Sequence, residues 1–538
     1  MRPTRLALLC LISIAGPLSA ADLLPADKPL ADVIDHYVEK KLKTAGIAPA
    51  EPADDYTLIR RLTLDLVGRI PTTSETSEYA ASKDPQKREK LVERLMASPA
   101  FVRHQATQFD AMMASPNGKT GGLRDYLVKA LGENRPWDQL FRDMLLPDET
   151  DVKKKGAGEF LRARVSDLDR LTNDVSVLFF GVNVSCAQCH DHPLVNDWKQ
   201  DHFYGMKSFF ARTFDAGGTV AEREFAQVKF KPTKGPERQA RMMFLSGGAI
   251  DAPGQKEPTK EEEKADKERV EKAKKDKKPP PPPAFSARAK LVEVALQTKE
   301  SEFFSRSIAN RLWHRFLGFG LVMPLDQMHS ENKPSHPELL AWMARDVVAN
   351  KYDLRRTIRG IVLSKTYSRA SKSASETPPS PGLFAVGRLK PLTPMQLATS
   401  LKLATIDPQS FEKLKADELE KRVEGFENAA RGLASSIAQP TDDFQIGVGE
   451  ALLFSNAAKV TSDFLADGND RLIGKAKGLN DPAKAVDLIV RTVLCRPPTA
   501  DETRALTEYL ARRTDRLPEA YRQVVWALVT SAEFRFNY

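Results

Sequence analysis

Residues 30–46 read LADVIDHYVEKKLKTAG, and this stretch shows the helical pattern that is typical of most of the chain. Its apolar side chains recur three or four positions apart, the spacing of one face of an α-helix. They are Leu30, Val33, Ile34, Tyr37, Val38 and Leu42. Gly46 follows as a stop signal, because glycine adopts the left-handed conformation that ends many helices. The stretch predicts an amphipathic helix that ends before Gly46.

Helix starts of one kind recur along the chain. In a capping box, a Ser or Thr hydroxyl and a Glu or Gln side chain three residues later satisfy free backbone N–H groups reciprocally. Four pairs fit this pattern: Thr72 with Glu75, Ser335 with Glu338, Thr393 with Gln396, and Thr499 with Glu502. Strand-like sequence is scarce. The best candidates are residues 225–230 and 241–245, the latter followed by Gly247 and Gly248.

Residues 253–284 break the helical pattern. They are almost entirely Lys, Glu, Asp, Ala and Pro, and they end in five prolines, Pro279 to Pro283. This composition offers too little apolar surface to fold, so we expect a disordered linker, in which Glu261 to Lys275 could form a transient charged helix. The proline run is typical of an extended spacer. The linker predicts an N-terminal domain over residues 22–252 and a C-terminal domain over residues 285–538.

The N-terminus has the pattern of a secretory signal. Arg2 and Arg5 precede an apolar run, Leu6 to Ile14, and small residues follow at positions 19–21. These features predict a signal peptide over residues 1–21 and export to the periplasm or cell envelope. The run is too short to span a bilayer, and the expected mature chain has no transmembrane segment. An uncleaved N-terminal anchor is the alternative.

Charge and motifs exclude several functions. A net charge of +9 over 538 residues is a mild bias. Without a basic stripe or a helix-turn-helix or finger spacing, it does not indicate nucleic-acid binding. The motifs of serine hydrolases, zinc proteases, P-loop proteins and dinucleotide-binding proteins are absent.

The most specific motif is Cys186-Ala187-Gln188-Cys189-His190. C-x-x-C-H is the attachment motif of c-type haem: two thiols reach the two vinyl groups, and the histidine ligates the iron from one face. Cys186 and Cys189 would form the thioethers, and His190 would be the proximal metal ligand. Attachment follows export, so the signal peptide and this motif support each other. Cys10 would leave with the signal peptide, and Cys495 is expected to be a lone thiol.

Other interpretations of the motif stay open. An exported C-x-x-C pair can oxidise to a disulfide. Cys186, Cys189, His190 and His192 could ligate zinc, although their spacing is cramped for a tetrahedral site. A thioredoxin-type redox pair is a further alternative, but no βαβ pattern surrounds it.

Residues after the motif suit a haem pocket. Bulky walls are available in Trp198, Phe203, Tyr204, Phe209 and Phe210. His202 and Met206 are the candidate distal ligands, and a methionine would raise the reduction potential relative to a second histidine. His192 is too close to His190 to reach the opposite face, so we expect it at the haem edge. Met112 and Met113 are remote candidates. His329 and His336, which flank Glu331 and Asn332, could form a separate polar site with Asp326.

The chain resembles a planctomycete-type exported family. The resemblance rests on Phe179 to Pro193 and its continuation through Trp198, Asp201, Tyr204-Gly205 and Phe209-Phe210, on Arg60 to Leu66 with Gly68 and Pro71, and on Leu91 to Pro99. In the second half it rests on Asn310 to Trp313, Phe316 to Gly318, Pro334 to Leu340, Tyr352 to Leu354, Ser364 to Tyr367, Arg388 with Pro391 to Thr393, Arg496 to Thr499, and Ser531 to Phe534.

The resemblance implies a pairing of two domains of unknown function. The N-terminal one is cytochrome-c-like and carries the C-x-x-C-H motif. Many relatives begin with an additional small cytochrome c domain that this chain lacks. Where relatives show a Trp/His-rich stretch, this chain has residues 104–109, HQATQF, so a ligand role for that stretch is in doubt.

Together these features predict a mainly α, multi-helical two-domain protein with a small β unit after the C-x-x-C-H segment. The expected function is electron transfer between one covalent haem c and an unidentified redox partner protein. The alternatives are a peroxidase-like or oxidative haem enzyme with an extracellular substrate, and a non-haem envelope scaffold or binding protein with a disulfide or zinc site.

Overall fold

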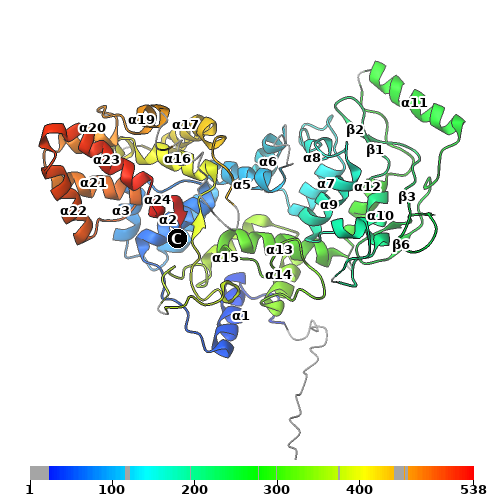
Figure 1. Ribbon diagram of the computed structural model, residues 1–538, viewed down its shortest axis with the longest axis horizontal. Coiled ribbons are helices and arrows are strands. Elements are labelled where there is room, and N and C mark those ends of the chain that lie inside the picture. The colour runs from blue at the N-terminus through cyan, green and yellow to red at the C-terminus, as the bar shows by residue number, and fades with distance from the viewer. Residues whose placement is uncertain are drawn as a thin grey trace, which may run out of the picture.

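The computed structural model describes residues 23–114, 122–193, 195–276, 278–297, 300–373, 376–412, 414–440, 454 and 458–538. The predicted signal peptide, residues 1–21, lies outside these residues. The fold is mainly α with small β hairpins, as the sequence predicts (Figure 1). None of the helices in the described ranges combines the length and apolar character needed to cross a membrane.

The first half is a series of helices followed by three hairpins. The helices are α1 (Leu30–Ala45), α2 (Asp55–Val67), α3 (Thr73–Ala81), α4 (Lys87–Ala97), α5 (Pro99–Met112), α6 (Leu123–Gly132), α7 (Trp137–Leu145), α8 (Glu159–Arg162), α9 (Leu168–Phe180), the 3-10 turn η2 (Ser185–Gln188) and α10 (Gln200–Ser208). The strands are β1 (Thr213–Asp215), β2 (Val220–Glu222), β3 (Lys229–Phe230), β4 (Arg238–Gln239), β5 (Met242–Met243) and β6 (Ala249–Ile250). They pair antiparallel as β1 with β2, β3 with β4, and β5 with β6. A small β unit therefore follows the C-x-x-C-H segment, with shorter strands than the sequence predicts.

The second half is also helical. It contains α12 (Ala287–Ala295), α13 (Ser301–Leu317), α14 (Pro337–Ala349), α15 (Leu354–Leu363), η3 (Pro381–Leu383), α16 (Pro394–Ala404), η4 (Pro408–Phe411), α17 (Ala416–Ala434), α19 (Ala458–Phe464), α20 (Leu472–Gly478), α21 (Pro482–Leu494), α22 (Ala500–Ala511), η5 (Thr514–Arg516), α23 (Leu517–Val529) and α24 (Ala532–Arg535). Strands β7 (Lys390–Pro391) and β8 (Phe536–Asn537) pair antiparallel, so the last residues return to the middle of the molecule.

Local signals decide most helix boundaries. Helix α1 ends at Gly46, whose φ is 67°, as its sequence predicts. The capping boxes at Thr72, Thr393 and Thr499 are confirmed. The box at Ser335 is wrong, because His336 occupies the N-cap position of α14 and no side chain caps the helix. Ser335 lies one residue too early for its hydroxyl to meet the third helical amide, and it contacts His336 Nδ1 at 3.1 Å instead.

The larger apolar core takes side chains from both halves of the sequence. It runs from Leu30 in α1 through α10 and continues with α12 to α15 of the second half. A second core is built from residues 392–534 together with Leu64 and Ile70 of the first half. Helices α20 to α23 lie at one end of the molecule, whereas α7, α9, α10 and the hairpins lie at the other (Figure 1).

The segment expected to be a disordered linker contains a helix. Residues Lys260–Lys275 form α11, which projects beyond the hairpins (Figure 1). Val270 and Ala273 are buried, and Arg269 Nη2 donates to the Glu222 carbonyl at 2.8 Å. One side of this charged segment therefore packs on the β unit.

A buried ion pair joins the two halves of the chain. Lys390 Nζ lies 2.7 Å from Asp65 Oδ2, and only 8% of the Asp65 side chain is exposed. The same carboxylate accepts hydrogen bonds from the Tyr367 hydroxyl and from Asn537 Nδ2, both at 2.8 Å. Burial raises the pKa of Tyr367 well above its usual value, and the neighbouring Asp65 charge raises it further. This Asp65 cluster, defined as Asp65, Tyr367, Lys390 and Asn537, connects α2 to three later segments.

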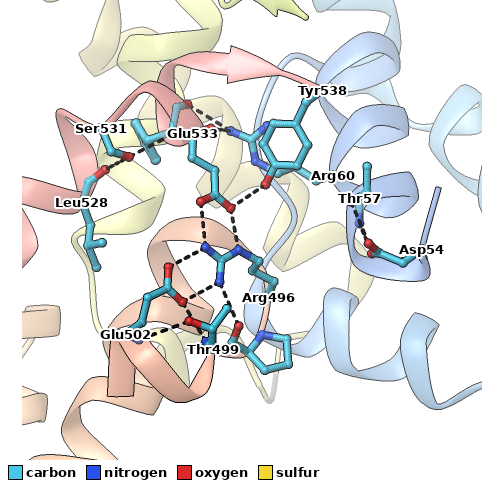
Figure 2. Close-up of polar contacts among 12 residues, drawn as sticks. Asp54, Thr57, Arg60, Arg496, Thr499, Glu502, Leu528, Ser531, Glu533 and Tyr538 are labelled. Atoms are coloured by element: carbon cyan, nitrogen blue, oxygen red, sulfur yellow. Dashed lines mark hydrogen bonds and ion pairs between the residues drawn. The ribbon is translucent and has the colours of Figure 1, made fainter. Parts of the chain in front are cut away.

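The C-terminus is anchored by a charged network (Figure 2). Arg496 makes paired contacts of 2.5 to 2.8 Å with Glu502 and Glu533. The Tyr538 hydroxyl donates to Glu533 at 3.1 Å, and Arg60 Nη1 of α2 donates to the Phe536 carbonyl at 2.7 Å. The hydrogen bonds from Arg496 lower the pKa of Glu502 to about 2, so the network stays ionised at neutral pH. It ties the last helix to both α22 and α2.

Candidate functional site

The C-x-x-C-H motif forms an exposed turn between α9 and α10. Helix α9 ends at Gly181, which has a φ of 70°, and the chain then enters the 3-10 turn η2. Ala187 points into the core and is fully buried. Cys186, Cys189 and His190 are exposed, and the Cys186 and Cys189 thiols are free. The alternation of one small buried residue with exposed neighbours presents both thiols on the surface.

A hydrogen bond to a neighbouring carbonyl orients the His190 ring. Its Nδ1 lies 2.7 Å from the carbonyl oxygen of Asp191. A carbonyl oxygen can only accept, so this contact assigns the proton to Nδ1 and leaves a lone pair on Nε2. The Asp191 carboxylate in turn accepts from the backbone N–H of Gln200 at 3.0 Å. A histidine held in this way is suited to bind a metal through Nε2.

Helix α10 holds the C-x-x-C-H turn in place through two side-chain hydrogen bonds. The Tyr204 hydroxyl donates to the Gln188 carbonyl at 3.0 Å, and Gln200 Nε2 donates to the Cys189 carbonyl at 3.2 Å. Tyr204 itself stacks on Phe230 of β3, with ring centroids 4.2 Å apart. The β unit therefore supports the helix that supports the motif.

A second segment pairs with the residues just before the motif. Val182 bridges to Gln327, the Asn183 backbone N–H donates to the Asp326 carbonyl at 2.8 Å, and the Met328 N–H donates to the Gly181 carbonyl at 3.0 Å. This pairing brings Met328 and His329 of the second half beside the motif.

A cavity of about 480 Å³ lies between the start of α10, residues 245–246, the start of α13 and residues 322–334, and we call it the first cavity. Its walls include Trp198 and His202, Leu245 and Phe303, and Met328 with His329. His202 Nδ1 accepts from the Lys199 backbone N–H at 3.1 Å. Burial lowers the pKa of His202, which favours the neutral imidazole that a metal ion requires.

The structure brings some of the predicted site residues together and separates others. His202 lines the first cavity, and the His192 ring lies beside that of His329, with centroids 6.4 Å apart. Met206 is on the same helix as His202 but is fully buried in the core, and it is not among the residues that line the first cavity. Met113 is also buried, and Met112 lines a different cavity.

The sequence did not point to Met328, and it pointed to His329 only as part of a separate polar loop. Both reach the motif through the pairing of residues 181–183 with residues 326–328, which are more than a hundred positions apart. No local sequence pattern predicts such a pairing. The His329 Nδ1 atom is buried and has no hydrogen-bond partner among the described residues.

The arrangement fits covalent haem in three respects. Both thiols are exposed and free, the His190 Nε2 lone pair is available, and α10, which contacts the turn, also contributes His202 to a cavity with aromatic walls; Cys186, Cys189 and His190 do not themselves line that cavity. For a zinc site, a group of three or more His, Cys, Asp or Glu side chains would be needed. The residues that the structure describes contain no such group in a metal-holding arrangement.

Two further residues singled out in the sequence lie elsewhere. His104 is buried and faces the Asp65 cluster, away from the motif. Cys495 is buried at the end of α21, where burial raises the pKa of its thiol to about 12. A thiol that stays protonated is chemically inert, in contrast to the two exposed thiols of the motif.

These features define a mainly helical protein whose two apolar cores both take side chains from the two halves of the sequence and that displays a C-x-x-C-H turn. Comparison with protein families then identifies its parts. Residues 33–215 match PSCyt2, described as a protein of unknown function (DUF1549), and residues 287–510 match PSD1, described as a protein of unknown function (DUF1553). The chain therefore carries both of these domains. No curated protein and no solved structure matches it.

Proposed function

We propose that this protein is an exported c-type haem protein that transfers electrons to or from a partner protein. The observation that carries the proposal is the exposed turn, in which two free thiols and His190 with an available Nε2 atom lie together. Cys186 and Cys189 would hold the group through thioethers, and His190 would ligate its iron. When bound, haem supplies one-electron redox chemistry.

His202 is the better of the two predicted distal ligands. Its side chain borders the first cavity, and burial lowers its pKa, which favours the neutral imidazole. Met206 is enclosed by the core, and its sulfur would have to leave that core to reach a cofactor. A histidine pair gives a lower reduction potential than a His–Met pair. We therefore assign the distal position to His202.

A haem enzyme is the second candidate. The first cavity is also lined by Glu302, Arg306 and His329, whose polar side chains could act on a small substrate. That cavity lies within the size range of small-molecule sites. An open distal position would be the mark of this second function.

The test is a visible spectrum of the protein matured in an exporting host, recorded oxidised and reduced. We expect a low-spin six-coordinate spectrum with sharp α and β bands on reduction. His202→Ala is expected to give a five-coordinate, high-spin spectrum, because the distal nitrogen is removed. The reduced variant should also bind carbon monoxide. The matched control is His36→Ala, an exposed histidine of α1, and it should leave the spectrum unchanged.

Each other outcome has a definite meaning. An unchanged low-spin spectrum in His202→Ala would exclude His202 as the distal ligand. A five-coordinate wild-type spectrum with peroxide turnover would replace electron transfer by the enzyme function. A protein without a Soret band, from a host that matures a control cytochrome, would overturn the haem proposal itself.

A further inference from the structure

A larger cavity of about 630 Å³ lies between α2, α5, the C-terminal half of α13 and residues 388–396, and we call it the second cavity. Loop residues Met323 and Leu325 line it, whereas Val322 and Met328 of the same loop line the first cavity. The two cavities therefore lie on either side of one loop. The second cavity contains no residue of the C-x-x-C-H turn.

The charges around the second cavity are unequal. Its cationic side chains are Arg311, Arg315, Arg388 and Lys390, and Asp65 is its only carboxylate among the described lining residues. That carboxylate is already occupied: Lys390 forms an ion pair with it, and the Tyr367 hydroxyl and the Asn537 amide donate to it. Asp65 thus compensates Lys390 and leaves three guanidinium groups without a matching anion among the described lining residues.

Contacts within the described chain do not neutralise these arginines. Arg311 Nη2 donates to the Val177 carbonyl at 2.5 Å, and Arg315 Nη2 donates to the Gln105 side-chain oxygen, so both of these partners are uncharged. The Nε atoms of Arg311 and Arg388 are buried and lack a hydrogen-bond partner among the described residues. Asp326 and Asp65 act on Arg311 and Arg315 only through their charge, which partly offsets the effect of burial on the pKa of each arginine, and no ion pair of the three with a described carboxylate is found.

Arg311 and Arg315 nevertheless remain charged at neutral pH. Burial lowers the pKa of Arg311 and Arg315 to about 10, which is still well above neutrality. Aromatic faces support two of the guanidinium groups: Arg315 lies 5.2 Å from the Phe316 ring centroid and Arg388 lies 5.5 Å from that of Phe319. Partly buried, stacked guanidinium groups with free N–H donors are suited to bind an oxyanion through two parallel hydrogen bonds.

The remaining walls are apolar. Phe109, Leu312, Phe319 and Leu325 line the cavity, and Leu389 at its rim is 58% exposed. An exposed leucine beside stacked arginines offers a surface for an apolar group that adjoins an anionic one. Volume, wall chemistry and charge thus agree with a small-molecule site.

We propose that the second cavity binds a small organic anion, one that joins a carboxylate, sulfate or phosphate group to an apolar or aromatic body. Arg311, Arg315 and Arg388 contact the oxyanion, while Phe109, Phe319 and Leu389 contact the body. The proposal does not depend on haem, since none of these residues belongs to the C-x-x-C-H turn or to the first cavity.

The experiment is isothermal titration calorimetry on the full-length mature protein. Naphthalenesulfonate is the probe, and naphthylmethanol is its neutral counterpart of similar size; inorganic sulfate and phosphate test the anion alone. We expect naphthalenesulfonate to bind, with an affinity that falls as salt is added, and to bind at least about tenfold more tightly than naphthylmethanol. Arg388→Met should weaken naphthalenesulfonate binding by about tenfold or more.

Arg504→Met is the matched control, because Arg504 is exposed on α22 and pairs with Asp501, which does not line the second cavity. It should leave the affinity unchanged. Circular dichroism melts of both variants establish that each is folded, and Arg311→Met provides a second cavity variant if Arg388→Met fails that check. Equal binding of the anion and its neutral counterpart, equal binding by the Arg388 variant and the control, or no measurable binding of naphthalenesulfonate would each overturn the proposal.

Discussion

Asp65→Ala is expected to lower the free energy of unfolding by about 3–5 kcal/mol, the usual cost of removing one partner from a buried ion pair. The substitution leaves Lys390 as a buried ammonium whose remaining acceptors among the described residues are the carbonyls of Phe316 at 2.9 Å and Arg315 at 3.4 Å. It also deprives the Tyr367 hydroxyl and the Asn537 amide of their acceptor. Because these partners lie in three segments, the loss should loosen the contact between the two halves.

Urea unfolding followed by circular dichroism measures this effect. Asp501→Ala is the control, since Asp501 is an exposed aspartate in an ion pair with Arg504, and its loss should cost less than about 1 kcal/mol. The double variant Asp65→Leu/Lys390→Met removes both charges and should recover part of the loss. A single Asp65→Ala variant as stable as the control would show that the Asp65 cluster does not hold the halves together.

Gly68→Ala is expected to destabilise the protein by about 2–4 kcal/mol, the sum of a left-handed backbone penalty and a steric clash. Gly68 ends α2 with a φ of 77°, and an added Cβ would collide with the imidazole ring of His104. That ring is buried, and burial lowers the pKa of His104 to about 3, so the ring is neutral. It also borders the second cavity, so the clash can be relieved only by shifting the ring from its present contacts.

Gly46→Ala provides a closely matched comparison. Gly46 also ends a helix in the left-handed region, with a φ of 67°, but an added Cβ there would meet nothing within 4 Å. Thermal melts should show that Gly46→Ala lowers the free energy of unfolding by about 1 kcal/mol, because this substitution adds backbone strain alone. Gly68→Ala should cost clearly more. In a background that already carries His104→Ala, its additional cost should fall to that of Gly46→Ala. Equal losses for the two glycines would contradict the role assigned to the His104 contact.

Local sequence signals predicted local structure well. The helical spacing from Leu30 to Leu42 and the glycine after it correctly predict α1, because both depend only on neighbours within a few residues. Three capping boxes are confirmed for the same reason. The box at Ser335 failed because proline at position 337 begins α14 one residue later than the pattern requires.

Contacts between residues far apart in the sequence could not be predicted from such signals. The larger core joins α1 to α15 although the lysine- and proline-rich segment separates the two halves in sequence. Asp65 meets Tyr367, Lys390 and Asn537 across more than 300 residues, and no periodicity encodes that meeting. The candidate site divides in the same way. Its motif and His202 could be read from the sequence, whereas Met328 and the position of His329 depend on the pairing with residues 181–183.

The most direct test of the central claim is the intact mass of the mature protein under denaturing conditions. The protein is expressed in an exporting host with c-type maturation machinery, and Cys186→Ala/Cys189→Ala is measured beside it. We predict a mass increase equal to one haem that survives denaturation in the wild type and is absent from the double variant. An unmodified wild-type mass, from a host that attaches haem to a control cytochrome, would contradict the account and leave the disulfide interpretation of the motif.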